Sequence, residues 1–398
     1  MRRPAPALPF ALALALLPAL FSLPDRATAA EPARGEHLDI RASDGVVLRA
    51  TYWSPGKPGP GVLLLHMCNS DRTAWSGLGP RLAEKGIHAL ALDYRGYGES
   101  GGERPRDNEG RQREREKWPG DVDAAFAALG ARTGTESPIF GAAGGSCGVH
   151  QAIQLARRHP EVRTLVLLAG NTDAEGETFL ADNPWLPVFA AAARDDGNAV
   201  DTTRWLQGFS SNPYNHFAEY PDGGHGTEIF SVHADLEPAI AAWFERHLIT
   251  DPVARPAPGS PSAAPQPGPS AGLRASLLGP SGVAAMRVRH AAVKAGSKQT
   301  LPPEAVVNLL GYQRLGEDNH AAAIELFELN VDLYPDSANV YDSLADAYLA
   351  AGRRDDALRE SRKALELLPA DPARDTPGEQ AIREAAQAKV DELTKPGG

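Results

Sequence analysis

Between residues 36 and 250, short apolar runs alternate with longer amphipathic segments. Runs of four to eight apolar or alternating residues are typical of strands, and apolar residues spaced three and four apart are typical of helices. The pattern predicts strands at residues 37–42, 46–53, 61–66, 87–93, 137–143, 164–169, 186–193 and 215–220. It predicts helices at residues 72–86, 118–129, 149–156 and 235–248. Strands that alternate with helices predict a mostly parallel, eight-stranded sheet with helices on both faces.

The pattern changes after residue 250. Residues 251–285 are rich in proline, alanine, glycine and serine, which predicts a semi-flexible linker rather than a core segment. Residues 286–395 then have the apolar spacing of helices, which predicts a second, all-α domain.

Within this second domain, residues 304–337 align with residues 338–371 as two units of 34. A period of 34 is typical of tetratricopeptide repeats, and the second unit has small and aromatic residues at the positions that such repeats require. These positions are Tyr341, Leu344, Ala345, Tyr348, Ala357, Ala364 and Pro369. A further helix at residues 379–393 is expected to cap the stack. Such a module either binds a peptide or protein partner or stabilises the chain.

Residues 1–29 have the pattern of a secretory signal. Arg2 and Arg3 precede the apolar run Phe10–Leu23, and Ala27-Thr28-Ala29 has the small residues of a cleavage site. The apolar run is too short and too interrupted by proline to span a bilayer well. We therefore expect an exported protein, periplasmic or secreted, without a membrane span.

The composition is that of a globular chain with an acidic balance. Its 398 residues are 42% hydrophobic and 23% charged, with a formal net charge of −11. The length exceeds that of one ordinary core and predicts two domains. The acidic balance argues against nucleic acid or an anionic membrane as the main partner. The sequence has no phosphate loop, zinc-ligand spacing or EF-hand pattern, so we expect neither a cofactor nor a metal.

The most specific motif is G-x-S-x-G at residues 144–148, between a predicted strand and a predicted helix. A serine at the apex of a sharp strand-to-helix turn is the arrangement of a nucleophile elbow. The turn requires small residues two positions to either side, which the outer glycines supply. Shifting the motif by one residue would make Cys147 the apex but would place the β-branched Val149 at the second small position. The pattern therefore favours Ser146 over Cys147 as the nucleophile.

Four motifs in this order resemble the α/β-hydrolase family over roughly residues 36–250. His66-Met67-Cys68-Asn69 stands where the family has a His-Gly turn, and residues 92–100 match its D-x-R-G-x-G-x-S loop. The elbow is the third motif, and residues 223–226 match the glycine-flanked histidine after the last strand. The compact form most resembles dienelactone-hydrolase-like esterases. The resemblance implies an α/β-hydrolase fold and a serine hydrolase.

In this family the catalytic residues follow the order serine, acid, histidine. Ser146 comes first, and His225 is the one histidine in a glycine-flanked turn after a predicted strand. The acid should follow the strand at residues 186–193. The family often has a G-x-x-D pattern here, and counting it from Ala193, which replaces the glycine, places the acid at Asp196, with Asp195 as the alternative. Serine needs the histidine as its base, and the acid keeps that base in one tautomer.

The resemblance also implies an oxyanion hole made by the backbone N–H groups of Cys147 and Met67. Met67 stands where the family has glycine, but donation requires only the backbone. His66 is expected to be a structural turn residue. The two cysteines of the chain, Cys68 and Cys147, adjoin these two donors on turns that face each other in the fold. An exported compartment permits a disulfide between them, and two small buried residues are the alternative.

Together these features predict an exported, cofactor-free serine esterase that acts on a small-molecule ester. One alternative is a serine peptidase or amidase with the same three residues. The other is a non-catalytic interaction protein that uses the repeats. Residues 101–117 and 171–184 are expected to form the rim of the site, and the arginines of the first segment are expected to pair with its own glutamates.

Overall fold

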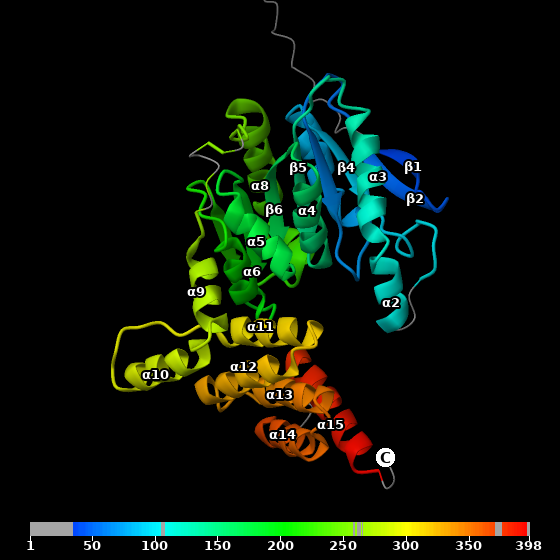
Figure 1. Ribbon diagram of the computed structural model, residues 1–398. Coiled ribbons are helices and arrows are strands. Elements are labelled where there is room, and N and C mark those ends of the chain that lie inside the picture. The colour runs from blue at the N-terminus through cyan, green and yellow to red at the C-terminus, as the bar shows by residue number, and fades with distance from the viewer. Residues whose placement is uncertain are drawn as a thin grey trace, which may run out of the picture. The chain divides into compact units, whose positions relative to one another are not determined.

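The computed structural model describes residues 35–104, 108–257, 259–260, 264, 266–370 and 376–395. The predicted signal at residues 1–29 lies outside the described residues. Residues 36–250 are called the sheet domain below, and residues 269–393 the helical region (Figure 1).

The sheet domain is built on eight strands in the order β1-β2-β4-β3-β5-β6-β7-β8. The strands are β1 Glu36–Arg41, β2 Val47–Trp53, β3 Gly61–Leu65, β4 His88–Leu92, β5 Phe140–Gly145, β6 Val162–Leu168, β7 Val188–Ala193 and β8 His216–Tyr220. β2 pairs antiparallel with both of its neighbours, and all other pairs are parallel. This confirms the predicted mostly parallel, eight-stranded sheet, and its order is that of an α/β-hydrolase fold.

The burial of each strand follows its place in the sheet. β3, β4 and β7 are buried at every position, as expected of strands covered by helices on both faces. β1 alternates buried and exposed residues and β8 is only partly buried, because both lie at the edges. The continuous apolar runs in the sequence therefore located the centre of the sheet correctly.

Helices cover both faces of the sheet (Figure 1). Those of the domain are α1 Leu78–Glu84, α2 Asn108–Arg115, α3 Trp118–Gly130, α4 Cys147–Arg158, α5 Ala174–Asp182, α6 Ala199–Gln207, α7 Ile229–Val232 and α8 Leu236–Glu245. Short helical turns occur at η1 Arg72–Trp75, η2 Gly226–Glu228 and η3 Arg246–Thr250. One buried apolar cluster joins α3, α4, α5 and α6 to the sheet, and a second joins α1, α7 and α8 to its other face.

The D-x-R-G-x-G-x-S loop is held by buried ion pairs. The carboxylate of Asp93 accepts hydrogen bonds from the backbone N–H of Arg72 at 2.6 Å and of Glu99 at 2.9 Å, and it pairs with the Arg72 guanidinium. Arg95 pairs with the buried carboxylate of Asp121 at 2.5 Å. Buried charges require such partners, so the polar residues of this motif have a structural role at the end of β4.

The helical region contains helices whose bounds recur along the chain. They are α9 Pro269–Leu278, α10 Gly282–Lys294, α11 Glu304–Gly316, α12 His320–Leu333, α13 Ala338–Ala350, α14 Arg354–Leu367 and α15 Pro377–Leu393. α11 and α13 begin 34 residues apart, and so do α12 and α14. The α11–α12 pair therefore has the same length and spacing as the α13–α14 pair.

The first helix of each pair ends in the same hydrogen-bonded turn. After α11, the N–H of Asp318 bonds the Leu315 carbonyl at 3.0 Å, and the next N–H bonds the Arg314 carbonyl. After α13, the same two bonds are made 34 residues later around Gly352. Asp318 has a φ of 56° and Gly352 a φ of 73°, as the left-handed residue of such a helix end requires.

The structure differs from the sequence-based prediction within residues 251–285. α9 and the start of α10 lie in this segment, and Leu277 of α9 is buried in the apolar cluster. The proline and glycine content suggested a linker, but Pro269 occupies the first turn of α9, where proline favours helix formation. Four helices and one helical turn of the sheet domain were also absent from the prediction: α2, α5, α6, α7 and η2.

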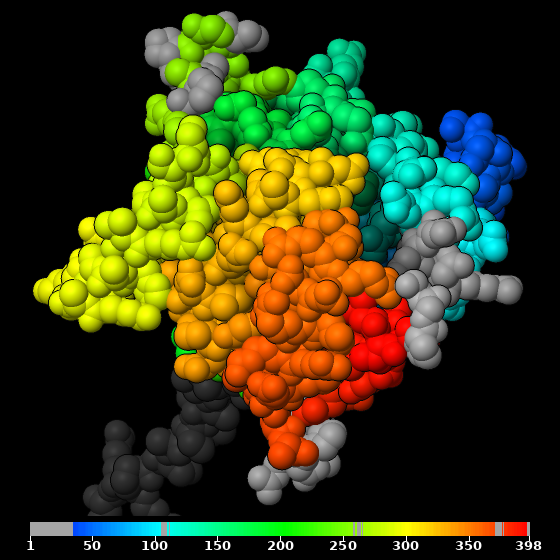
Figure 2. Space-filling view, turned by 60° about the horizontal axis from the view of Figure 1, so that its bottom comes forward, coloured from blue at the N-terminus to red at the C-terminus, as the bar shows by residue number. Residues whose placement is uncertain are grey.

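The helical region packs against α5 and α6 of the sheet domain, and Figure 2 shows it in yellow to red. Leu206 of α6 and Val307 and Leu310 of α11 share one buried apolar cluster. At the same contact, the buried carboxylate of Glu177 accepts hydrogen bonds from Trp205 at 3.2 Å and from Gln313 at 3.3 Å.

The Glu177 carboxylate also pairs with Arg274 of α9 at 3.1 Å. Burial raises the pKa of Glu177, and the Arg274 charge opposes that rise. One carboxylate thus joins α5, α6, α9 and α11.

Candidate active site

Ser146 lies between β5 and α4 with a backbone conformation that L-residues rarely adopt. Its φ is 51° and its ψ is −119°. The Ser146 N–H donates to the Leu168 carbonyl at 2.9 Å, and its carbonyl accepts from the Val149 N–H at 2.9 Å. Strained residues of this kind cost about 1–3 kcal/mol and persist where the surroundings hold them in place. The apex of the turn is therefore Ser146, and Cys147 is the first residue of α4.

The outer glycines of the motif are required by close backbone contacts. A Cβ on Gly144 would overlap the Gly148 carbonyl, and a Cβ on Gly148 would overlap the Leu65 carbonyl at the end of β3. β3 and β5 are paired with Leu65 opposite Gly144, so the turn after β3 lies beside the elbow. The sequence argument for small residues on either side of the serine agrees with this packing.

His225 lies between β8 and η2 and faces an acid that follows β7. Its Nδ1 is 2.6 Å from Oδ2 of Asp196. Nδ1 donates to the carboxylate, which leaves Nε2 as an acceptor. This hydrogen bond raises the pKa of His225, and burial opposes the rise. The imidazole is thus held in the tautomer that can accept a proton at Nε2.

Asp195 makes different contacts from Asp196. Its two carboxylate oxygens accept the N–H groups of Gly223 at 3.0 Å and Gly224 at 3.1 Å. Asp195 therefore holds the backbone of residues 221–228, called the histidine loop below, whereas Asp196 bonds the imidazole of His225. The two acids that the sequence left as alternatives have distinct positions in the structure.

The histidine loop lies against the elbow. A Cβ on Gly145 would come 3.4 Å from the Thr227 side chain and 3.0 Å from the Met67 side chain. A Cβ on Gly226 would also contact the Met67 side chain. The buried Met67 thus packs between the residue before Ser146 and the residue after His225. Within the described residues, Ser146 Oγ has no hydrogen-bond partner, and such contacts commonly close only when substrate binds.

The turn after β3 is fixed through the carbonyl of Met67. That carbonyl accepts from His66 Nδ1 at 2.6 Å and from the Ser70 N–H at 3.1 Å. His66 Nε2 accepts from the Tyr94 N–H at 3.1 Å, so His66 is a neutral Nδ1–H tautomer whose pKa is lowered by burial. These are the contacts of a structural residue.

Two backbone donors remain near Ser146. Among the described residues, the N–H groups of Met67 and Cys147 make no hydrogen bond. The Cys147 N–H belongs to the first turn of α4, where backbone donors have no partner within the helix. Unpaired N–H groups of this kind can stabilise a negative oxygen.

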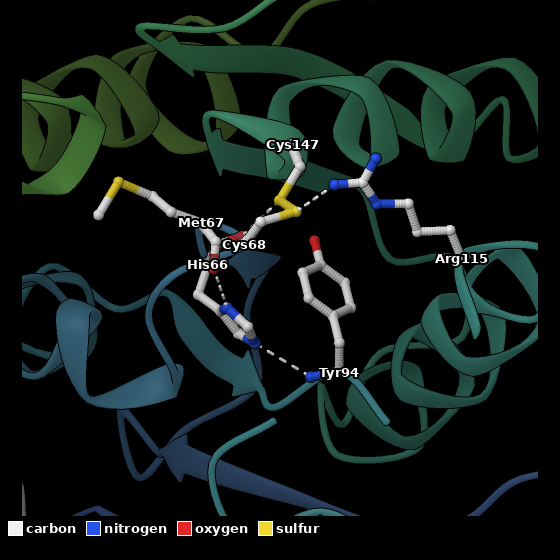
Figure 3. Close-up of a disulfide and its surroundings, with 6 residues drawn as sticks. All are labelled: His66, Met67, Cys68, Tyr94, Arg115 and Cys147. Atoms are coloured by element: carbon white, nitrogen blue, oxygen red, sulfur yellow. Dashed lines mark hydrogen bonds between the residues drawn. A yellow bond between two sulfur atoms is a disulfide. The ribbon is translucent and has the colours of Figure 1, made fainter. Parts of the chain in front are cut away.

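A disulfide between Cys68 and Cys147 joins the two turns that carry these donors (Figure 3). The Cα atoms are 5.8 Å apart, within the usual range for a disulfide. It connects the segment after β3 to the first residue of α4.

Sequence reasoning did not single out Arg115. This residue ends α2, and its Nη2 donates to Sγ of Cys68 at 3.1 Å (Figure 3). In the described part of the chain it has no acidic partner, whereas Lys117 pairs with Glu114 at 3.2 Å. The expectation that the arginines of residues 101–117 pair with glutamates of that loop is therefore wrong for Arg115. Only the three-dimensional fold distinguishes it from the other arginines nearby.

No cluster of three or more histidine, cysteine, aspartate or glutamate side chains that could hold a metal occurs among the described residues. No helix in the same part of the chain is long and apolar enough to cross a membrane.

The chain is similar in sequence to a known protein family and to proteins of two organisms. Residues 56–195 match the family model described as serine aminopeptidase, S33. The chain is 33% identical over 64 residues to a serine hydrolase-like protein of Dictyostelium discoideum, covering 16% of this chain and 18% of that protein. It is 30% identical over 156 residues to an uncharacterized protein of Mycobacterium tuberculosis, covering 39% of this chain and 52% of that protein. The chain thus spans about half the length of the mycobacterial relative and less of the other.

Among solved structures, an esterase of Pyrococcus furiosus is similar at 17% identity, covering 54% of this chain and 91% of the esterase, with a TM-score of 0.43. A dienelactone hydrolase of Anabaena variabilis is similar at 16% identity, covering 55% of this chain and all of that protein, with a TM-score of 0.43. The strand order and the family match over residues 56–195 together indicate an α/β-hydrolase fold for the sheet domain.

Proposed function

We propose that the protein is an exported carboxylic-ester hydrolase in which Ser146, His225 and Asp196 act as nucleophile, base and orienting acid. The observation that carries this proposal is the strained Ser146 turn, packed through Met67 and Thr227 against the loop of a histidine that Asp196 holds at 2.6 Å. Backbone strain at Ser146 and a fixed tautomer of His225 do not improve the packing of the fold, but nucleophilic catalysis requires an exposed nucleophile and an oriented base.

The proposed reaction begins when Ser146 Oγ attacks the ester carbonyl carbon and its proton passes to Nε2 of His225. The carbonyl oxygen becomes negative and accepts the N–H groups of Cys147 and Met67. The bond to the alkoxy oxygen then breaks, and Nε2 returns the proton to the departing alcohol. Asp196 stabilises the imidazolium formed between these two transfers.

Water completes the cycle. Nε2 takes a proton from a water molecule, whose oxygen attacks the acyl carbon of the ester on Ser146. The second tetrahedral intermediate collapses, the bond to Oγ breaks, and Nε2 protonates Oγ. A carboxylic acid leaves, and the residues return to their starting states.

A serine aminopeptidase with the same three residues is the second candidate, because the matching family carries that description. An aminopeptidase must bind the α-ammonium group of its substrate close to the nucleophile. The Arg115 guanidinium instead contacts the disulfide that links Cys68 to the residue after Ser146. Like charges repel, so this cation disfavours the binding of an ammonium group and supports an ester as the substrate.

We further propose that residues 1–29 direct export and that residues 304–337 and 338–371 are tetratricopeptide repeats, with a peptide or protein as their partner. The equal spacing of α11 with α13 and of α12 with α14 supports the repeat assignment. The contact of α11 with α6 supports the stabilising role as an alternative to partner binding.

The test compares kcat/KM on short acyl esters with kcat/KM on aminoacyl amides of the same leaving-group class. We expect turnover of esters well above that of amides, lost in Ser146→Ala and retained in Ser76→Ala, a change at an exposed serine. Preference for aminoacyl amides would replace the esterase proposal by the peptidase one. Absence of turnover on both classes in folded protein would favour a non-catalytic interaction protein.

A further inference from the structure

Three groups that stabilise a thiolate converge on the Cys68–Cys147 disulfide. The first is the N-terminus of α4, because Cys147 is the first residue of this 12-residue helix. The partial positive charge at a helix N-terminus lowers the pKa of a thiol placed there. On reduction, Cys147 would therefore be released as a thiol that ionises readily.

The second group is Arg115. Its guanidinium donates to Cys68 Sγ at 3.1 Å and lies over the Trp118 ring, with 5.7 Å between its carbon and the ring centroid. Within the described residues it has no carboxylate to neutralise it. A cation in contact with a cysteine sulfur favours the thiolate over the thiol.

The third group is the hydroxyl of Tyr94. This residue is fully buried, and its hydroxyl has no hydrogen-bond partner within the described part of the chain. Its ring is stacked on Trp118 at 4.2 Å between centroids, and the hydroxyl points toward the disulfide (Figure 3). A buried donor without an acceptor calls for an explanation. A thiolate formed on reduction would supply the missing acceptor.

We propose that the Cys68–Cys147 disulfide is a reducible, redox-active bond whose dithiol form is stabilised by Arg115, Tyr94 and the N-terminus of α4. A disulfide becomes more oxidising when its surroundings stabilise the reduced form, because the free energy of the dithiol falls while that of the bond does not. Both cysteines are only partly buried, so a thiol reagent can reach them.

The reaction partner is a small or protein thiol. Its thiolate attacks Cys147 Sγ, the S–S bond breaks, and Cys68 leaves as a thiolate beside Arg115. A second external thiolate attacks the outer sulfur of the mixed disulfide and releases Cys147 as a thiolate, which α4 stabilises. Two external thiols have then become one disulfide, and the two electrons reside on Cys68 and Cys147.

Reduction also has a consequence for hydrolysis, and this part rests on the proposed function. The disulfide links the turn that carries the Met67 donor to the helix that carries the Cys147 donor. Breaking it frees these two donors from a covalent constraint, and catalysis by an oxyanion hole is sensitive to small displacements. We therefore expect the reduced form to turn over esters more slowly than the oxidised form.

The experiment equilibrates the folded, full-length protein with mixtures of reduced and oxidised glutathione and traps free thiols with an alkylating agent. Mass spectrometry then gives the fraction reduced at each mixture. We expect the bond to open in the native state, within the range that glutathione can buffer. Arg115→Gln should shift the equilibrium constant toward the disulfide by about tenfold, and Tyr94→Phe by a smaller factor, because each removes a partner of the thiolates.

Lys117→Gln is the matched control, since this nearby cation pairs with Glu114 rather than with sulfur. It should leave the equilibrium constant within about twofold, because exposed paired charges act weakly at a distance. A bond that opens only when the protein unfolds would overturn the proposal. So would Arg115→Gln and Tyr94→Phe proteins that reduce as the wild type does.

The alkylation readout needs no hydrolysis, so it separates the two proposals. Loss of ester turnover with an intact redox equilibrium would remove only the proposed function. A redox-inert bond in an active hydrolase would remove only this inference.

Discussion

The carboxyl edge of the sheet and the helical region differ in backbone conformation, hydrogen bonding and the pairing of charged groups. At this edge, Ser146 and Ala169 have positive φ. Among the described residues, the backbone N–H groups of Met67 and Cys147 make no hydrogen bond, and Arg115 donates to a cysteine sulfur rather than to a carboxylate. In the helical region, α11 and α13 end in the same hydrogen-bonded turn, and charged side chains form ion pairs such as Arg287 with Asp332. Natural chains break local rules mainly where function requires it, so the first region is where chemistry is expected.

The contrast is clearest between Ser146 and Asp318. Both have positive φ, but Asp318 lies in the hydrogen-bonded turn that ends α11. In the equivalent turn after α13, the residue at this position is Gly352. That conformation has an ordinary explanation in helix termination. Ser146 has none, because its φ and ψ serve only to expose its side chain at the apex. Substitutions in the first region should therefore change activity, and those in the second should change stability.

The largest expected effect is at His225. We predict that His225→Ala lowers kcat/KM on a short acyl ester by about a thousandfold or more, because it removes the base that accepts the serine proton in the proposed mechanism. The melting temperature should change little, since the side chain is partly exposed. His233→Ala is the control, because His233 bonds Asp222 at 2.8 Å on the same loop. Equal losses in the two proteins would contradict the assignment.

The next effect separates the two neighbouring acids. Asp196→Asn should lower kcat/KM by about a hundredfold or more, because it removes the anion that orients and stabilises the imidazolium. Asp195→Asn should have a smaller effect, since Asp195 bonds only the loop backbone. The reverse order would make Asp195 the acid.

The same pair has a pH signature. Hydrolysis requires neutral His225, so kcat/KM should fall as the pH drops through the pKa of this residue. Asp196 raises that pKa above its ordinary value of 6.5, which places the acid limb of the wild-type profile above pH 6.5. Removing the anion in Asp196→Asn should move the limb to lower pH. A limb that moves to higher pH, or does not move, would show that Asp196 does not act on the essential histidine.

Where the helical region contacts α5 and α6 of the sheet domain, the expected effect is on stability. Glu177→Ala should lower the free energy of unfolding by about 3 kcal/mol, because it leaves Arg274 and the Trp205 and Gln313 donors without their buried acceptor. Arg287→Ala, which breaks an exposed pair with Asp332, should cost less than about 1 kcal/mol. Urea unfolding measures both. A large loss of ester turnover in folded Glu177→Ala protein would contradict the expectation that changes at this contact affect stability and leave activity intact.

The smallest effect is at Asp318. Asp318→Gly should raise the free energy of unfolding by about 0.5–1 kcal/mol, because glycine adopts positive φ without the steric cost of a side chain. Thermal unfolding should show a slightly higher midpoint and ester turnover should be unaffected. A lower midpoint would mean that the Asp318 side chain contributes more than its backbone conformation costs.

Sequence patterns predicted the sheet well because its central strands are continuous apolar runs that only a doubly covered sheet can bury. They predicted the position of Ser146 because the outer glycines are imposed by backbone contacts that any sharp elbow must make. The helices α5 and α6 were missed because they are short and their polar faces weaken the apolar period.

The partners of the site residues were harder to predict. Asp195 and Asp196 are adjacent in sequence, and only the fold directs one toward the loop backbone and the other toward His225. Arg115 is one of several arginines in its segment, and its contact with Cys68 depends on where α2 ends. Glu177 contacts residues on α6, α9 and α11, which begin 22 to 127 residues later in the chain, so no local pattern could mark it as a buried acid.

The central claim is that Ser146 is an activated nucleophile, and covalent labelling by a fluorophosphonate tests it most directly. The folded protein should take up one label per chain, peptide mapping should place the label on Ser146, and Ser146→Ala should take up none. Folded wild-type protein that remains unlabelled, or a label on another residue that persists in Ser146→Ala, would contradict the account.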